Sequence, residues 1–419
     1  MFGALALIKR LVDRAIPIFL IVTFAKIAVF VLLAASNRAK PFVGDNAADL
    51  YIPIGRRLAT EHRFNGVDSR PDSKVPPAYP AVLAVLMTAA PENWQVAAVC
   101  LQMLVDLAVA VLLLLLGTRF LSPACGAMAG LVWLLYPPEI AISTWITAEP
   151  IFTGLFAGSL ILMLWWFDRN PGMQLLAGLV LGLAALFRGT PILLSPLLLI
   201  VFLKRRLYLQ GIAFVLGFVL VVVPWSIRNR VVLHDQIAIS VGFGSVFLQG
   251  SDERVLTIAG KRENMGVLYR EAAEEGIRKP ANNFESQIDH WLFEVGLYEY
   301  KQRLRGRPLS YLPFFARKFV LLWCSTEGGS AGAQLVLALC SLPIVVPGMR
   351  RLWVWNRVPT DFTLVCGAVA IYFILLHVTT LPLNRYMLPL YPILTLAACD
   401  AWLMWMMPQH PKNPASTSI

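Results

Sequence analysis

Three acidic residues stand beside apolar segments, where a carboxylate could act on a substrate at a membrane surface. Asp45 and Asp49 lie in the segment GDNAADLY, directly after an apolar run, and Glu149 lies in TAEP, directly before another. A carboxylate in this position can accept the proton of an incoming hydroxyl, provided that it stays ionised and basic. We therefore take the three as candidate catalytic residues. An acid that stabilises a helix N-terminus before Pro150 is the alternative interpretation of Glu149.

Arginines at the ends of other apolar runs are candidates for binding an anion. Arg188, Arg228 and Arg385 are expected at the same level as the acids. The planar guanidinium group binds two phosphate oxygens at once, so these residues suit a phosphate leaving group. The alternative is that each arginine only meets lipid headgroups at a helix end.

The chain that must position these residues has a membrane-protein composition. Of its 419 residues, 58% are hydrophobic and only 15% are charged, and its formal net charge is +11. Because Lys and Arg accumulate on cytoplasmic loops, this excess does not indicate nucleic acid. Runs near the roughly 20 residues that cross a bilayer predict an all-α polytopic protein of about 10 transmembrane helices, within a range of 10–13. The predicted spans are Ile16–Ala35, Trp94–Gly117, Ser122–Pro137, Pro150–Phe167, Met173–Phe187, Pro191–Leu203, Tyr208–Val223, Gly332–Val346, Phe362–Thr379 and Met387–Met407.

The basic clusters fix the predicted orientation. When the spans alternate, the clusters at 9–14, 204–206 and 350–357 fall on one side, which makes both termini cytoplasmic. Two long loops, 36–93 and 224–330, then lie on the opposite side and should carry the function. We expect short surface helices at Ala48–Glu61 and Met265–Ile277, broken or tilted helices among the shorter runs, and a disordered tail at 409–419.

Ionisable residues inside the spans require partners. Lys26 and Asp106 lie at equal depth in the first two spans, which favours an ion pair between them. His377 and Asp400 are interpreted as helix-packing or cavity residues. The sequence has no Cys/His cluster and no Asp-x-Asp pair with neighbouring ligands, so neither a cofactor nor a metal is predicted, although Asp45 with Glu149 could gather a divalent ion.

Five segments, in order, resemble the GT-C superfamily of membrane glycosyltransferases, in particular the bacterial protein O-mannosyltransferases and aminoarabinose transferases. They are GDNAADLYIPIGRRL with PPAYPAVLAVL, YPPEIAISTWITAEPIF, GLVLGLAALFRGTPILLSPLLL, VVVPWSIRNRVVL with SVGFGSVFLQG, and NRYMLPLYPILTLAA. The resemblance implies a single GT-C-like transmembrane domain over 1–419. It also implies an enzyme of the cell envelope in the bacterial inner membrane, with its active site on the periplasmic face.

The implied activity is inverting transfer of a sugar from a polyprenyl phosphate to a hydroxyl acceptor. The resemblance places the base at Asp45. The family pattern has a tyrosine three or four residues after the acid, whereas Tyr51 follows Asp45 by six residues and Asp49 by two, so Asp49 stays open as the base. It places the second acid at Glu149 and the donor phosphate near Arg228, with Arg385 as second choice. The implied partners are the polyprenyl-phosphate sugar and membrane lipid.

Two other functions fit the same features. A transporter or flippase of lipid-linked sugars needs a lipid groove and phosphate-binding arginines, but it also needs polar residues through the bilayer depth. A polymerase or ligase of lipid-linked glycans differs in its diphosphate-linked substrate. Neither the sugar nor the acceptor, whether glycolipid, lipopolysaccharide or protein, follows from the sequence.

Overall fold

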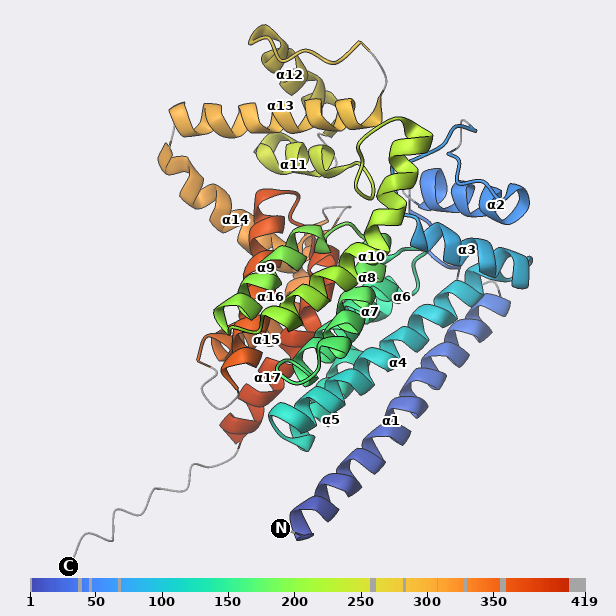
Figure 1. Ribbon diagram of the computed structural model, residues 1–419, viewed down its shortest axis with the longest axis vertical. Coiled ribbons are helices and arrows are strands. Elements are labelled where there is room, and N and C mark those ends of the chain that lie inside the picture. Colours follow the sequence, from blue (N-terminus) through green and yellow to red (C-terminus); the bar gives the residue numbers. More distant parts are fainter. Residues whose placement is uncertain are drawn as a thin grey trace, which may run out of the picture.

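The computed structural model is a bundle of helices with a helical cap at one end (Figure 1). It describes residues 2–36, 40–44, 47–66, 69–256, 261–281, 284–306, 308–326, 330–354 and 359–406. The helices of five or more residues in these ranges are α1 (Phe2–Ala35), the π-helix η1 (Ala47–Tyr51), α2 (Ile52–Glu61), α3 (Ala78–Ala89), α4 (Trp94–Phe120), α5 (Pro123–Leu135), α6 (Pro137–Ser143), α7 (Glu149–Trp165), α8 (Pro171–Phe187), α9 (Pro191–Lys204), α10 (Tyr208–Leu233), α11 (Phe243–Ser251), α12 (Lys261–Glu274), α13 (Glu285–Gly306), α14 (Tyr311–Cys324), α15 (Ala331–Trp353), α16 (Thr360–Thr379), the 3₁₀ helix η5 (Asn384–Leu390) and α17 (Tyr391–Met406).

Every predicted span corresponds to a helix, but their lengths differ from the prediction. Six helices of the described residues are long and apolar enough to cross a membrane, and α5 with α6 makes a seventh if this pair, bent by 55°, is one span. The predicted spans at α7, α8 and α9 are shorter apolar helices of 10–17 residues. At 1.5 Å per residue these are shorter than the ~30 Å hydrocarbon core. The expected number of about ten spans is therefore not confirmed, whereas the all-helical membrane architecture is.

Small residues allow neighbouring helices of the bundle to pack closely. A Cβ added at Gly178 of α8 would lie 1.9 Å from the carbonyl oxygen of Phe214 in α10. A Cβ added at Gly117 of α4 would lie 2.3 Å from the Cα of Gly126 in α5. Glycine at such contacts lets two backbones touch, which is how helices associate where lipid removes the hydrophobic driving force. The α4–α5 and α8–α10 pairs are fixed in this way.

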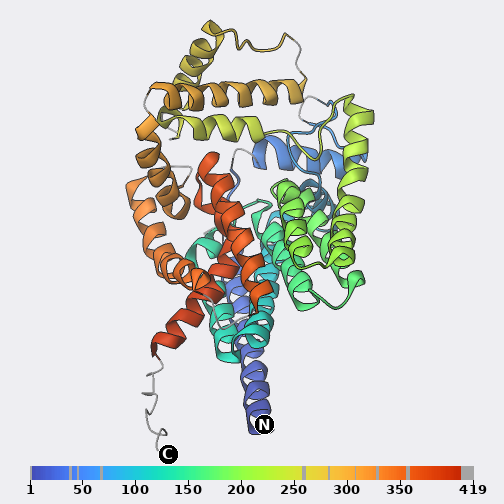
Figure 2. The same cartoon turned by 60° about the vertical axis from the view of Figure 1, so that its left-hand side comes forward.

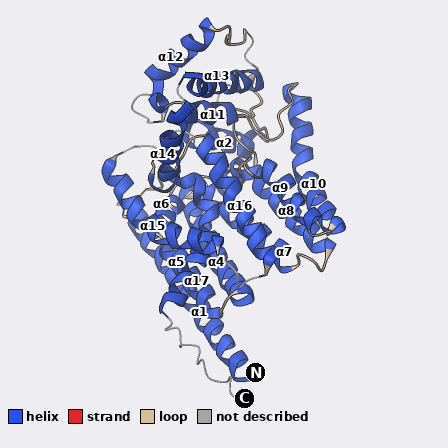
Figure 3. Cartoon of the chain, turned by 90° about the vertical axis from the view of Figure 1, so that its left-hand side faces the viewer, coloured by secondary structure: helices blue, strands red, loops and turns tan. Residues whose placement is uncertain are grey.

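The cap consists of α11, α12 and α13, and α14 leads from it back to the bundle (Figures 1 and 2). It has a small core of its own that includes Leu248, Leu268, Trp291 and Val295. The surface helix α2 lies at this same end, close to α11 and α13 (Figure 3). We call this end the loop face because α2 and the cap helices belong to the two long loops, 36–93 and 224–330. The start of α1 and the end of α17 lie at the opposite end, as predicted for two termini on one side. The tail at 409–419 lies outside the described residues.

Charged residues inside the bundle have partners. The predicted pair is confirmed, with 3.6 Å between Lys26 Nζ and Asp106 Oδ2. Ser143 Oγ lies 2.7 Å from Asp106 Oδ2 and 3.1 Å from Glu139 Oε1, so a second carboxyl that the sequence analysis did not consider joins this cluster. Lys26 also donates to the carbonyl of Leu134 at the α5–α6 bend, over 3.3 Å. The cluster therefore fixes the bend that leads to Glu149.

The two other ionisable residues of the predicted spans also pack within the protein. Asp400 of α17 accepts a hydrogen bond from Arg351 Nε at 2.6 Å. His377 of α16 is buried and its ring lies 5.3 Å from that of Tyr386. The packing interpretation of both is confirmed.

Candidate functional site

Backbone pairing brings together the two segments that lead to the predicted acids. Phe42 forms a parallel bridge with Trp145: its N–H donates to the carbonyl of Thr144 at 3.1 Å, and its carbonyl accepts from the N–H of Ile146 at 2.9 Å. The rings of Phe42 and Trp145 lie 4.6 Å apart. Because the bridge is parallel, both segments leave it in the same direction, one towards Gly44 and the other towards Glu149.

Glu149 is the meeting point of two of the predicted arginines. It opens α7, is 4% exposed, and its Oε1 is directly hydrogen-bonded by Arg188, the residue that follows α8. Arg385 Nε, from η5, lies 3.8 Å from the same oxygen, and Thr147 donates to the other carboxylate oxygen. Two guanidinium groups thus face one carboxylate. Since arginine stays charged, the three groups carry a net charge of about +1.

Aromatic residues surround these charges. The guanidinium carbons of Arg188 and Arg385 lie 4.7 Å and 5.2 Å from the ring centre of Tyr386, at distances typical of cation–π contacts. Tyr51 closes the π-helix η1, and burial together with the nearby Glu149 carboxylate raises the pKa of Tyr51 to about 12. Its phenol is therefore neutral at physiological pH. It offers a hydrogen-bond donor beside the excess positive charge.

A glutamine inside α4 holds the backbone that precedes Glu149. Gln102 is fully buried, and its Nε2 donates to the carbonyls of Ser143 and Trp145 at 2.8 Å and 2.7 Å. Its Oε1 accepts from the Tyr79 hydroxyl at 3.0 Å, and the Tyr79 ring packs edge-on against Tyr51 at 5.2 Å. The Gln102 side chain thus links the backbone that precedes Glu149 to Tyr79 and, through the Tyr79 ring, to Tyr51. Sequence reasoning passed over Gln102, although a polar residue in an apolar helix is itself a signal.

The other predicted residues are placed as follows. Asp45 lies outside the described residues, so its position relative to Glu149 is a prediction. Asp49 is exposed and lies in η1, two residues before Tyr51. Arg228 does not join the Glu149 group among the described contacts; its guanidinium donates to the carbonyls of Asp72 and Phe64 at 3.2 Å and 3.1 Å. It therefore ties α10 to the first long loop, and its predicted contact with a phosphate is a separate expectation.

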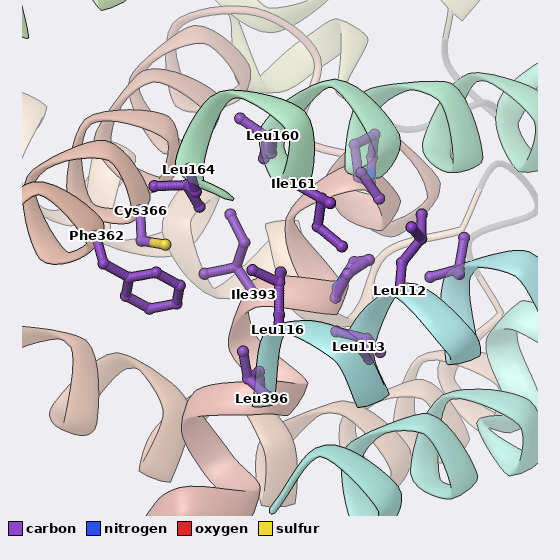
Figure 4. Close-up of a pocket in the computed structure, with 14 residues that line it drawn as sticks. Leu112, Leu113, Leu116, Leu160, Ile161, Leu164, Phe362, Cys366, Ile393 and Leu396 are labelled. Atoms are coloured by element: carbon purple, nitrogen blue, oxygen red, sulfur yellow. The ribbon is translucent and has the colours of Figure 1, made fainter. Parts of the chain in front are cut away.

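An apolar cavity lies deeper in the bundle, between α4, α7, α16 and the η5–α17 segment (Figure 4). Leu113, Leu160, Phe362, Cys366 and Ile393 point into it. Its volume is only about 20 Å³. This is room for about one water molecule and not for a polyprenyl chain. Among the described residues, no group of three or more His, Cys, Asp or Glu side chains could hold a metal ion.

Solved membrane enzymes resemble this chain at low sequence identity. The crystal structure of ArnT from Cupriavidus metallidurans bound to undecaprenyl phosphate is 17% identical, with a TM-score of 0.49, over 93% of this chain and 59% of that one. The archaeal oligosaccharyltransferase AglB from Archaeoglobus fulgidus, in complex with an inhibitory peptide and a dolichol-phosphate, is 11% identical, with a TM-score of 0.53, over 91% of this chain and 50% of that one. The chain thus spans between half and three fifths of these two structures. No protein-family model and no curated protein matches it.

The likeness to AglB confirms the predicted fold class: the chain is an all-helical bundle with the fold of that protein, and several of its helices are long and apolar enough to cross a membrane. At this level of identity the likeness concerns the fold. Activity has to be argued from the site itself.

Proposed function

We propose that the protein is an inverting glycosyltransferase that moves a sugar from a polyprenyl-phosphate donor to a hydroxyl acceptor at the loop face. In this proposal the protein resides in the bacterial inner membrane and the loop face is periplasmic. The observation that carries the proposal is the convergence of Arg188 and Arg385 on Glu149 at the end of an apolar bundle. Glu149 and the two arginines together carry a net charge of about +1, and the arginine side chains are 22% and 15% exposed.

A phosphate attached to a membrane lipid matches this environment. Its charge is complementary to the excess guanidinium, and the lipid would deliver it along the apolar surface of the bundle to the loop face. The AglB structure of similar fold was solved with a dolichol-phosphate, which supports the same class of ligand for this chain. The Tyr51 phenol could donate to a phosphate oxygen, since it is protonated.

The reaction then has a defined division of roles. A carboxylate of the first loop, Asp45 or Asp49, takes the proton of the acceptor hydroxyl as its oxygen bonds to the anomeric carbon. The bond between that carbon and the phosphate oxygen breaks on the opposite face, which inverts the configuration. Arg188 and Arg385 stabilise the charge that grows on the departing phosphate. Glu149 orients the two guanidinium groups, because a carboxylate that already receives two arginines and Thr147 is a poor proton acceptor.

A transporter of lipid-linked sugars is the competing function, and the interior of the bundle does not favour it. The charged cluster at mid-depth is closed by its own partners, with exposed side-chain fractions of 12% for Lys26 and 1% for Asp106. The cavity in Figure 4 is apolar and narrow. A path for a sugar across the membrane would need polar groups that face a wet space. We therefore prefer chemistry at the loop face.

The test is transfer from a radiolabelled polyprenyl-phosphate sugar in membranes that contain the wild-type protein or single variants. Asp45→Asn and Asp49→Asn identify the base: we expect one of them to lower the transfer rate by about 10²–10⁴-fold, the range for a lost general base. Asp168→Asn is the matched control, because Asp168 is exposed and lies between α7 and α8, away from the loop face. If both first-loop variants transfer sugar at the wild-type rate, this mechanism is wrong.

A further inference from the structure

A second hollow lies on the loop face, outside the Glu149 group. It is formed between the segment that follows α10 and one side of α13. Its volume is about 340 Å³. That volume falls within the ~300–1,000 Å³ of small-ligand pockets. Its lining combines the aromatic rings of Phe243 and Phe293 with the polar groups of Ser240, Ser286, Asp289 and His290.

The wall of this hollow is built rigidly. Asp289 Oδ1 accepts the backbone N–H groups of Gly242 and Gly244, both at 3.0 Å. Gly242 has φ +121°, a conformation that other residues rarely adopt. A Cβ at Gly244 would lie 1.8 Å from the carbonyl oxygen of Asp289, so α11 and α13 are in direct backbone contact there. The hollow therefore exists before any ligand arrives.

Aromatic faces and hydrogen-bonding groups stand side by side in it. Phe243 is 49% exposed, although it is a large aromatic residue on a polar cap. Its ring centre lies 6.0 Å from that of Phe293, and the Phe293 and His290 rings are stacked at 6.5 Å and 24°. The negative face of an aromatic ring attracts polarised C–H groups, while hydroxyl and imidazole groups bond to hydroxyls. A sugar ring presents both kinds of surface.

The charges around the hollow exclude the phosphate end of the donor. Ser286 of the lining donates to Asp235 at 2.6 Å, and His290 lies 3.4 Å from Glu294, so with Asp289 three carboxylates lie in or beside the hollow. A phosphate would be repelled here, whereas it is attracted to the Arg188–Arg385 pair. The two sites of the loop face therefore carry charge of opposite sign: negative around the hollow and positive at the Arg188–Arg385 pair. This one suits an uncharged ligand.

Hydrogen bonds connect the hollow to the first long loop. Val241, which lines it, donates its N–H to the carbonyl of Ser73 at 3.0 Å. Ser73 Oγ donates to Glu285 at 2.6 Å, and Lys74 forms an ion pair with the same carboxylate at 3.3 Å. A ligand in the hollow would thus lie against the loop that supplies Asp45 and Asp49.

We propose that this hollow binds the acceptor of the reaction and that the acceptor is a neutral saccharide, recognised by stacking on Phe243 and by the polar groups opposite. The assignment of a neutral saccharide stands on the hollow alone, whereas its role as acceptor rests on the proposed function.

Saccharide binding can be measured without any donor. Purified protein in nanodiscs would be exposed to a set of neutral oligosaccharides, and contacts would be detected by saturation-transfer NMR and quantified by titration. We expect binding that Phe243→Ala weakens by about tenfold, and that Phe243→Trp retains because it keeps an aromatic face. Phe284→Ala is the matched control, since Phe284 is similarly exposed (46%) and does not line the hollow.

Each result decides the proposal. It is overturned if no neutral saccharide binds, if Phe243→Ala binds as the wild type does, or if a phosphorylated lipid or an acidic peptide competes for the same residues. Should Phe243→Ala unfold, His290→Ala replaces it, and loss of this polar partner is expected to weaken binding in the same way, while Phe243→Trp remains the variant that retains binding. Saccharide binding by a protein that transfers no sugar would refute the proposed function and leave the binding site standing.

Discussion

Replacing Glu149 by glutamine removes one charge from the candidate site and keeps the shape of the side chain. With Arg385 Nε at 3.8 Å from Glu149 Oε1, Coulomb's law gives an attraction of about 4 kcal/mol at an effective dielectric constant of ~20. Arg188 lies closer and loses at least as much. Because breaking a buried ion pair costs about 3–5 kcal/mol, we expect the free energy of unfolding of Glu149→Gln to fall by an amount of this order.

The same substitution has the opposite effect on an anionic ligand. The summed charge of Arg188, Arg385 and residue 149 rises from about +1 to +2, so a phosphate meets a more positive environment. We expect polyprenyl phosphate to bind Glu149→Gln about tenfold or more tightly, which corresponds to about 1.4 kcal/mol. Transfer should nevertheless be slower, because the product carrier leaves slowly and the arginines lose their fixed orientation.

The assay is competition for a labelled polyprenyl phosphate in nanodiscs, together with thermal unfolding with and without that ligand. The added ligand should restore more stability to Glu149→Gln than to the wild type, since ligand stabilisation grows with affinity. Asp168→Asn again serves as the control. Equal or weaker phosphate binding by Glu149→Gln would refute the assignment of Arg188 and Arg385 to the donor phosphate.

Three further predictions concern the groups that support the site. Gln102→Leu leaves two carbonyls and the Tyr79 hydroxyl without their partner, so it should lower both transfer and the unfolding free energy, the latter by about 1–3 kcal/mol, as measured by denaturation in detergent. Lys26→Met should destabilise the protein more than Asp106→Asn, because only the first leaves two carboxyls without a cation, and ranked melting temperatures test this. Burial and neighbouring carboxylates raise the pKa of Glu299 from 4.5 to about 7, so the folded cap holds this proton more tightly than the unfolded chain. Stability should therefore fall as pH rises from about 4.5 to 7, and Glu299→Gln should abolish that dependence in thermal unfolding measured against pH.

The apolar runs predicted where helices occur but not how many cross the membrane. Hydrophobicity measures the preference of a segment for lipid, and this preference is the same for a helix that spans and for a short helix packed inside the bundle. The α5–α6 segment shows the difference: Pro137 and Pro138 remove backbone donors, and the chain bends by 55° there. Whether such a pair is one span depends on the partners at the bend, here Lys26 and its contact with Leu134.

The charged part of the site was more predictable than its uncharged support. Glu149, Arg188 and Arg385 stand out because they are ionisable groups that border apolar runs, where a charge that becomes buried needs a partner. That two arginines share one carboxylate, while Arg228 holds the first loop instead, depends on helix packing that no local pattern encodes. Glu139 escaped prediction because the segment that contains it was assigned to a connection between spans. Gln102 escaped because only charged residues were searched.

Two of the buried charge clusters in the bundle differ in a way that supports the proposed chemistry at the loop face. In the cluster at mid-depth, the carboxyls of Asp106 and Glu139 lie with one lysine, Lys26. Ser143 bonds to the carboxyls, and the carbonyl at the α5–α6 bend accepts from the lysine, so the buried groups have partners. An added anion would be repelled there. Near the loop face the count is reversed, with two guanidinium groups for one carboxylate, and their side chains retain contact with the surroundings. An anion from the membrane is therefore stabilised at the loop-face cluster and excluded from the one at mid-depth, which is the difference that an enzyme of lipid-linked phosphates requires.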